Sequence, residues 1–185
     1  MNSKLIPGQK APIFSTKDVF GNKIKLTSYR DKNVLVVFLR YAGCPWCNLA
    51  IHRLSIEYPL LKERNCEVVA FVQSSKVNIL TNIYGRHSTK PMFPIIADPE
   101  RKFYKKYDVK PSLKATSRVI VDIPYWLHSV KKHGFWQKKI DGSLFMAPGT
   151  FLINKDGDIA SVRYSTSLFD HQTFTDIYEQ LFLES

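Results

Sequence analysis

Two cysteines, Cys44 and Cys47, are the residues whose types and spacing are best suited to chemistry. An unbroken apolar run over 34–39 precedes them, and its length and β-branched content predict a strand buried on both faces. Pro45 stands where the first helical turn should begin, a position at which its missing N–H costs nothing. Apolar side chains then recur at helical spacing, at Cys47, Ile51, Leu54, Tyr58 and Leu61. We therefore expect Cys44 at the N-terminus of a helix and Cys47 one turn inside it.

A cysteine at a helix N-terminus faces free backbone N–H groups and the positive end of the helix dipole. These effects can lower a thiol pKa from about 8.5 to roughly 3.5–7.5, which favours the reactive thiolate. We expect Cys44 to be the more exposed thiol, because it precedes the helix whereas Cys47 faces the core. The field weakens within the first turn, so Cys44 should also be the more reactive thiol. The spacing therefore predicts redox chemistry, with Cys44 and Cys47 as the catalytic residues.

Two other interpretations of the cysteine pair stay open: half of a zinc site, or two inert thiols in the core. Zinc prefers four ligands, and the remaining candidates, Cys66 and His52, do not form a second paired motif. We therefore favour redox use and expect no metal ion and no bound organic cofactor. Cys66 begins an apolar strand and is expected to behave as a small buried hydrophobe.

Four side chains outside the pair have candidate roles. Arg40 would lower the pKa of Cys44 or hold a substrate oxygen, or else only pair with a surface carboxylate. Trp46, between the cysteines, is expected to be a partly exposed contact surface. His52 is interpreted as a hydrogen-bonded helix histidine rather than a proton shuttle, and Asp98 as a helix cap.

Hydrophobic periodicity and turn residues predict an α/β chain around this strand and helix. Pro59 should kink the cysteine-bearing helix. The expected elements are a hairpin at 11–26, a helical turn at 26–30, strands at 34–39, 67–73 and 93–97, helices from 45, over 75–84 and over 98–107, a hairpin at 150–164, and a last helix from Asp170.

The segment 110–146 does not fit this alternation of strands and helices. It is rich in lysine and aromatic residues, among them Tyr125, Trp126, Phe135 and Trp136. A helix over 124–133 is expected to turn its aromatic face toward the body of the protein. The segment is either a decoration that packs its own aromatic side chains, or a cover over the redox site or a surface for a partner.

Length and composition indicate one domain over 1–185 with an ample core, since 44% of the residues are apolar. The net charge of +11 would suit nucleic acid, an anionic membrane or acidic proteins. No nucleic-acid motif accompanies it, so we favour solvated lysines and expect no specific nucleic-acid partner. We expect no membrane span and no signal peptide, and hence a cytoplasmic location, because the sequence lacks apolar stretches of the required kinds.

Three stretches resemble peroxiredoxin-like proteins of the alkyl hydroperoxide reductase/thiol-specific antioxidant (AhpC/TSA) superfamily. They are FLRYAGCPWC (38–47), PIIADPERKFYKKYDV (94–109) and PGTFLINKDGDI (148–159). The order of elements around the cysteine pair is similar to the thioredoxin fold. The resemblance implies the peroxiredoxin-like variant of that fold: a central mixed β-sheet flanked by helices, an N-terminal β-hairpin, and a helical insertion, 110–146, before the last hairpin.

The sequence departs from this superfamily at three places. Typical members carry Pro-x-x-x-Thr-x-x-Cys, whereas this chain has Val37, Tyr41 and Cys44 there, so the hydroxyl that would position a peroxide is absent. Pro148 stands where those proteins carry an arginine. The run from Pro148 to Thr150 instead resembles the cis-proline loop of thioredoxin-type reductases, which faces the active disulfide. That likeness implies a cis Ala147–Pro148 bond close to Cys44, with Pro148 and Thr150 as candidate substrate-positioning residues.

The resemblance implies an antioxidant enzyme that reduces hydroperoxides through Cys44, with Cys47 as the resolving thiol. An external dithiol, such as the thioredoxin or glutathione system, would reduce the resulting disulfide. A thioredoxin-like protein disulfide reductase with the same cysteine pair is the alternative, and a binding module that uses 110–146 is a third interpretation. The sequence leaves open the substrate, the reductant and the oligomeric state.

Overall fold

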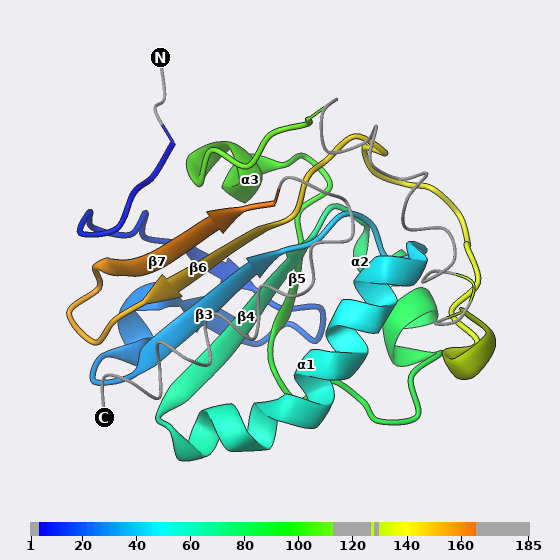
Figure 1. Ribbon diagram of the computed structural model, residues 1–185, viewed down its shortest axis with the longest axis horizontal. Helices are drawn as coiled ribbons and strands as arrows, with labels where there is room; N and C mark the ends of the chain where they lie inside the picture. The colour runs from blue at the N-terminus through cyan, green and yellow to red at the C-terminus, as the bar shows by residue number, and fades with distance from the viewer. Residues whose placement is uncertain (1–3, 113–126, 128–129, 166–185) are drawn as a thin grey trace.

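A five-stranded sheet forms the centre of the computed structural model, which describes residues 4–112, 127 and 130–165 (Figure 1). The strand order is β5-β4-β3-β6-β7, and β6 runs antiparallel to both β3 and β7, whereas β3, β4 and β5 are parallel. The strands are β3 (Asn33–Phe38), β4 (Cys66–Val72), β5 (Ile95–Ala97), β6 (Gly149–Ile153) and β7 (Ile159–Tyr164). This arrangement confirms the predicted central mixed sheet.

The middle strand, β3, is buried on both faces, as its apolar run predicts. Its side chains are at most 2% exposed from Val34 to Phe38. Leu35 and Val37 belong to one hydrophobic core, whereas Val36 and Phe38 belong to a second. The division follows from the pleat, because successive side chains of a strand point to opposite faces of the sheet.

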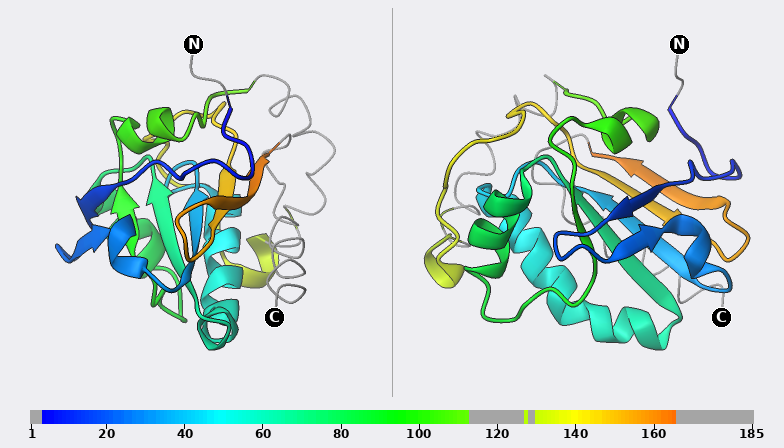
Figure 2. Two further views of the ribbon diagram at one scale, coloured as in Figure 1. Left: turned by 90° about the vertical axis from the view of Figure 1, so that its left-hand side faces the viewer. Right: turned by 180° about the vertical axis from the view of Figure 1, so that it is seen from behind.

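Helix α1 (Pro45–Glu63) covers one face of the sheet together with α2 (Lys76–Ile79), as Figure 2 shows. The apolar stripe expected of α1 is buried, at Cys47, Ile51, Leu54, Tyr58 and Leu61. Pro59 lies inside α1, and the helix changes direction over its second half (Figure 1). Because proline removes one helical hydrogen bond and crowds the preceding turn, this bend is the expected kink. A π-helical turn, Leu80–Tyr84, continues α2.

The other face is covered by α3 (Lys102–Lys106) and by the N-terminal hairpin. The hairpin consists of β1 (Ser15–Lys17) and β2 (Lys23–Lys25), and a 3-10 helix, η1 (Leu26–Tyr29), follows it. α3 is shorter than the predicted helix over 98–107, because Arg101 has a left-handed backbone (φ 58°). Asp98 caps α3 as expected, since its carboxylate accepts the N–H groups of Lys102 (2.8 Å) and Phe103 (2.7 Å).

Two predicted helices lie largely or wholly outside the described residues. The helix from Asp170 is wholly outside them, and of the helix over 124–133 only Leu127 and 130–133 are described, all of them helical. Within the described ranges, no helix has the length and apolar character needed to cross a membrane. The sheet with its flanking helices confirms the thioredoxin-like fold that the sequence predicts.

Candidate active site

Cys44 lies where β3 passes into α1, at the edge of the sheet formed by the carboxyl ends of the parallel strands. Its backbone is extended (φ −75°, ψ 125°), and Pro45 is the first helical residue. The carbonyl of Cys44 accepts the N–H of Asn48 at 3.1 Å, which is the first hydrogen bond of the helix. Cys44 therefore occupies the helix-terminal position that the sequence predicts for it.

Arg40 connects both sulfur atoms. Its guanidinium Nη2 donates to Cys44 Sγ at 3.3 Å, and its backbone N–H donates to Cys47 Sγ, also at 3.3 Å. Nη1 donates to the carbonyl of Leu144 at 3.2 Å, and the side chain lies over the Trp46 ring at 5.8 Å. Nε is buried and has no hydrogen-bond partner among the described residues. Of the two roles considered for Arg40, the structure favours the one at Cys44, because the guanidinium points to the sulfur and not to a carboxylate.

These contacts set the two thiol pKa values apart. Burial by itself raises the pKa of Cys44, but the hydrogen bond from Cys47 and the charge of Arg40 outweigh it and lower that pKa below the value of a free thiol. Burial raises the pKa of Cys47 well above that value, and the hydrogen bond to Cys44 and the negative charge there raise it further. The structure therefore favours a thiolate at Cys44 and a thiol at Cys47, both unlinked.

The expectation that Cys44 is the more exposed sulfur is wrong. Cys44 is 0% exposed and Cys47 is 2% exposed. The reason is the covering segment, residues 134–146, which runs past the N-terminus of α1 (Figure 1). Lys138 donates its backbone N–H to the carbonyl of Gly43 at 2.9 Å, so the covering segment lies directly on the turn that precedes Cys44. A sequence pattern predicts a helix terminus but not which distant segment packs onto it.

Polar contacts fasten the covering segment to the loops that follow β3 and β4. Asp141 accepts from the Ser74 hydroxyl at 2.6 Å, and that hydroxyl accepts the N–H of Ala42 at 2.7 Å. The N–H of Ser143 donates to the Gln73 side chain at 3.1 Å. Gly142 is close to Gln73 and to Tyr41, where an added Cβ would meet their Cβ atoms at 3.0 and 3.1 Å. The described part of the insertion is therefore packed over the site.

Comparison with known proteins assigns the family. The family model described as "AhpC/TSA family" matches residues 7–162. This protein belongs to the AhpC/TSA family. The chain is 23% identical over 169 residues, which are 91% of each chain, to a Mycobacterium tuberculosis protein named as a peroxiredoxin. The thiol-disulfide oxidoreductase ResA of Bacillus thuringiensis is 29% identical over 110 residues, 58% of this chain and 61% of that one.

A solved structure agrees with the fold of this AhpC/TSA protein. Peroxidoxin BcpB of Mycobacterium tuberculosis superposes with a TM-score of 0.67 at 14% identity, over 95% of each chain. The similarity therefore shows the fold, and the family match shows the chemical class. The AhpC/TSA protein is a thiol-dependent oxidoreductase.

Two residues that the sequence analysis did not single out hold the Cys44 turn of the AhpC/TSA protein. The fully buried Asn48 donates its amide to the carbonyls of Ala42 (2.7 Å) and Cys44 (2.9 Å). Its oxygen lies 2.9 Å from Nε2 of the buried His87. Burial, with the charge of nearby basic groups, lowers the pKa of His87 to about 3, so His87 is neutral and donates from Nε2. An amide on the apolar side of the helix, four residues after Cys44, is the signal that could have identified Asn48.

We expect Asn48→Leu to destabilise the reduced protein by about 2–4 kcal/mol, because the carbonyls of Ala42 and Cys44 and the ring of His87 would each lose one buried hydrogen bond. Urea unfolding measures the loss. Ser55→Ala is the matched control on α1, since the Ser55 hydroxyl makes a single buried hydrogen bond, to the carbonyl of Ile51 at 2.7 Å. Equal losses in the two variants would contradict a special role for Asn48.

Trp46 and His52 lie beside the thiol pair on α1. Trp46 is partly exposed, as expected of a contact surface. His52 lies 4.7 Å from the ring of His133, which belongs to the insertion, and 6.2 Å from that of His87. Burial and the neighbouring basic charges of Arg53 and Lys132 lower the pKa of His52. His52 therefore packs against the insertion, a contact that the sequence analysis did not predict.

Pro148 and Thr150 are placed by the pairing of β6 with β3. Thr150 is opposite Val37 and is buried, and Pro148 continues the strand at the same edge of the sheet as Cys44. The expected cis bond is wrong, because the Ala147–Pro148 peptide is trans. The Pro148 carbonyl accepts the N–H of Ser165 at 3.0 Å, which extends the hydrogen-bond ladder between β6 and β7 by one residue. Pro148 lines a surface pocket of about 380 Å³ with neighbours that include Asp108, Val109 and Tyr164.

Cys66 is fully buried at the start of β4, as expected of a small hydrophobe. Burial raises the pKa of the Cys66 thiol to about 12, which keeps it protonated and unreactive. Within the described ranges, no three His, Cys, Asp or Glu side chains are placed together to hold one metal ion.

Cys66→Ala should retain the full rate of thiol turnover and lose about 1 kcal/mol of stability, since it removes one buried sulfur. Turnover with a chemical oxidant and urea unfolding test the two parts separately. A well-folded Cys66→Ala protein that has lost activity would show that Cys66 acts as a further resolving thiol.

Proposed function

We propose that this protein reduces hydroperoxides through Cys44, with Cys47 as the resolving thiol. The observation that carries the proposal is the hydrogen bond from Arg40 to Cys44 Sγ at 3.3 Å, at a helix N-terminus. This contact stabilises the thiolate, which is the form that attacks an oxidant. The partner sulfur, Cys47, lies one turn inside the same helix and keeps its proton.

The proposed reaction has three balanced steps. The Cys44 thiolate attacks the terminal oxygen of a hydroperoxide, the O–O bond breaks, and the products are a sulfenic acid and an alcohol, with one proton taken up. Cys47 then attacks the sulfenic sulfur, so a disulfide forms and water leaves. An external dithiol, such as the thioredoxin or glutathione system, reduces the disulfide by two successive exchanges and is itself oxidised.

Arg40 supplies a donor for the peroxide in place of the absent threonine hydroxyl. Nη1 and Nη2 each make one hydrogen bond, to Leu144 and to Cys44, whereas the buried Nε has no partner among the described residues. A buried donor without a partner costs about 1–3 kcal/mol, which a bound oxygen would recover. Tyr41 stands where the threonine would be, but its hydroxyl already donates to the Gln137 side chain at 3.1 Å.

The burial of Cys44 also favours a small oxidant. The sulfur is 0% exposed beneath the covering segment, and Tyr41 and Ala42 beside it are at most 1% exposed. A hydroperoxide needs only a small opening to reach the sulfur. A protein disulfide must bring a second backbone to it, which requires the covering segment to move aside.

The decisive experiment is a stopped-flow reaction of the reduced protein with hydrogen peroxide and with cumene hydroperoxide. Loss of two thiols per peroxide, much faster than for free cysteine, supports the proposal. The same protein is then assayed with insulin and with dithiobis(nitrobenzoate). If both peroxides react slowly and the disulfides turn over rapidly, the protein is a disulfide reductase and not a peroxidase.

Protein disulfide reduction is the second candidate, and two observations favour it. The 110-residue similarity is to a protein named as a thiol-disulfide oxidoreductase, and the peroxiredoxin threonine and arginine are both missing here. In this reaction the Cys44 thiolate would attack a substrate sulfur, and Cys47 would release the reduced substrate from the mixed disulfide. If the protein reacts neither with peroxides nor with disulfides, a binding function of 110–146 without catalysis is indicated.

Gly43→Ala tests whether the covering segment controls access to Cys44. An added Cβ at Gly43 would lie 2.4 Å from the carbonyl oxygen of Lys139, so the backbone of the segment would have to move. We expect alkylation by a bulky maleimide to accelerate several-fold, and alkylation by iodoacetamide to change less. The wild-type protein in mild urea is the control for general loosening, because it should accelerate both reagents. An unchanged ratio of the two rates would mean that the segment does not limit access.

Two further expectations from the sequence stay predictions. They are a single domain over 1–185, with 110–146 as its insertion, and a cytoplasmic location. Limited proteolysis and fractionation of cells would test them.

A further inference from the structure

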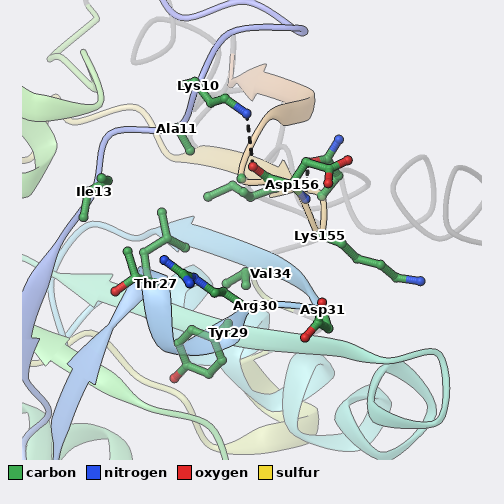
Figure 3. Close-up of a pocket in the computed structure, with 14 residues that line it drawn as sticks. Lys10, Ala11, Ile13, Thr27, Tyr29, Arg30, Asp31, Val34, Lys155 and Asp156 are labelled. Atoms are coloured by element: carbon green, nitrogen blue, oxygen red, sulfur yellow. Dashed lines mark hydrogen bonds between the residues drawn. The ribbon is translucent and has the colours of Figure 1, made fainter.

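A pocket of about 480 Å³ lies at the end of the sheet opposite to Cys44 (Figure 3). Val34 at the start of β3 and Ile153 at the end of β6 are paired, and both line it. The other walls come from the N-terminal segment, from η1 with the two residues after it, and from the turn at 154–157. Its volume is within the range of small-molecule sites, about 300–1,000 Å³.

Backbone hydrogen bonds hold the walls of this pocket together. The N–H of Ala11 donates to the carbonyl of Gly157 at 2.9 Å, and the N–H of Ile159 donates to Gln9 at 2.8 Å. The N–H of Leu26 donates to Phe14 at 3.1 Å. The N-terminal segment, η1 and the β6–β7 turn are thus fixed to one another, so the pocket is formed before any ligand binds.

The floor of the pocket is apolar, and one large apolar side chain stands exposed at its rim. Ala11, Leu26, Val34 and Ile153 are all buried in the core and present their edges to the pocket. Ile13 is 60% exposed beside them, although its backbone is anchored by Lys106. A ligand with an apolar body would remove Ile13 and the floor from water, which stabilises the complex.

The rim carries a cation that has no carboxylate partner. Lys10 is neutralised by Asp158, 2.9 Å away. No ion pair to Arg30 is found within the described ranges, and Figure 3 shows its guanidinium reaching toward Thr27 on the Ile13 side of the pocket. Lys155 extends away from the pocket in the same view. Asp31 and Asp156 also line the pocket, but Figure 3 shows both on the side of Lys155, away from the guanidinium of Arg30. Arg30 is therefore the positive group placed to meet a ligand.

We propose that this pocket binds a small amphipathic carboxylate, with its apolar chain on the floor and its carboxylate on Arg30. A guanidinium can donate two parallel hydrogen bonds to one carboxylate, which favours an anionic head of this kind over a neutral or cationic one. The apolar floor excludes small hydrophilic anions, and the volume admits a body of roughly ten carbon atoms. The pocket and Cys44 lie at opposite ends of the sheet, so this binding does not depend on the proposed redox function.

Calorimetric titration with sodium decanoate, below its micelle-forming concentration, tests the proposal. We expect saturable binding of one decanoate per chain, and no binding of acetate or of decylammonium. Arg30→Glu should weaken decanoate binding at least tenfold. Thr27→Trp, which places an indole over the floor from an exposed position, should do the same. Lys76→Glu makes the same change of charge on α2 and should leave affinity within twofold.

Circular dichroism and the alkylation rate of Cys44 verify that each variant is folded and has an intact redox site. Three outcomes would overturn the proposal: no saturable binding of decanoate, equal binding of decylammonium, or unchanged affinity in folded Arg30→Glu protein. Because alkylation of Cys44 is read separately, failure of the redox proposal would leave this result unaffected.

Discussion

Cys44→Ser should abolish both peroxide consumption and disulfide exchange, whereas Cys47→Ser should retain the first attack and trap its product. Only Cys44 has a pKa below that of a free thiol, because Arg40 and Cys47 donate to its sulfur. Without Cys47 no thiol is placed to resolve the intermediate. Mass spectrometry of the Cys47→Ser protein should find a sulfenic acid on Cys44 after peroxide, or a mixed disulfide after a protein disulfide. The product that accumulates distinguishes a peroxidase from a reductase.

Cys66→Ser is the matched control, since it removes the remaining thiol, which lies at the start of β4 and beyond the C-terminal end of α1. It should behave as the wild-type protein in both assays. An adduct on Cys47 in the Cys44→Ser protein, with turnover preserved, would reverse the assignment of the two sulfurs.

Arg40→Met should slow the alkylation of Cys44 at pH 7 by at least about tenfold, because a thiol whose pKa returns to about 8.5 is only a few per cent thiolate at that pH. With a pKa of about 6, Cys44 of the wild-type protein is mostly ionised there. Arg40 lowers the pKa of Cys44 against the opposing effect of burial. When the guanidinium is lost, burial is no longer balanced by charge and the pKa rises. The pH profile of alkylation should therefore move to higher pH. The alkylation rates of the wild-type protein and the variant should become equal only at a pH at which Cys44 is fully ionised in both proteins.

Two variants control the Arg40 experiment. Arg40→Lys keeps the charge but not the fork that joins Cys44 to Leu144, so its profile should lie between those of wild type and Arg40→Met. Arg64→Met removes an exposed arginine at the other end of α1 and should leave the profile in place. If the pH profile of Cys44 alkylation is the same in folded Arg40→Met protein as in wild type, Arg40 does not lower the pKa of Cys44.

Local patterns in the sequence determined the elements that carry the thiols. The apolar run predicts β3, and Pro45 with the helical stripe predicts the start and the buried face of α1. Asp98 predicts the cap of α3. These features depend on neighbours within one or two turns, which is why spacing alone predicts them. The three family-like stretches extend this to the thioredoxin-like fold, and the family match confirms it.

Tertiary packing decided the environment of the sulfur atoms. The covering segment, Asn48 with His87, and the trans bond before Pro148 all depend on contacts between residues far apart in the chain. The sequence left the direction of Arg40 open, and only the folded chain places its guanidinium between Cys44 and Leu144. Sequence spacing determines that a thiol stands at a helix N-terminus. Its exposure and pKa depend on which distant groups exclude water and supply charge there, and those groups meet only in the folded protein.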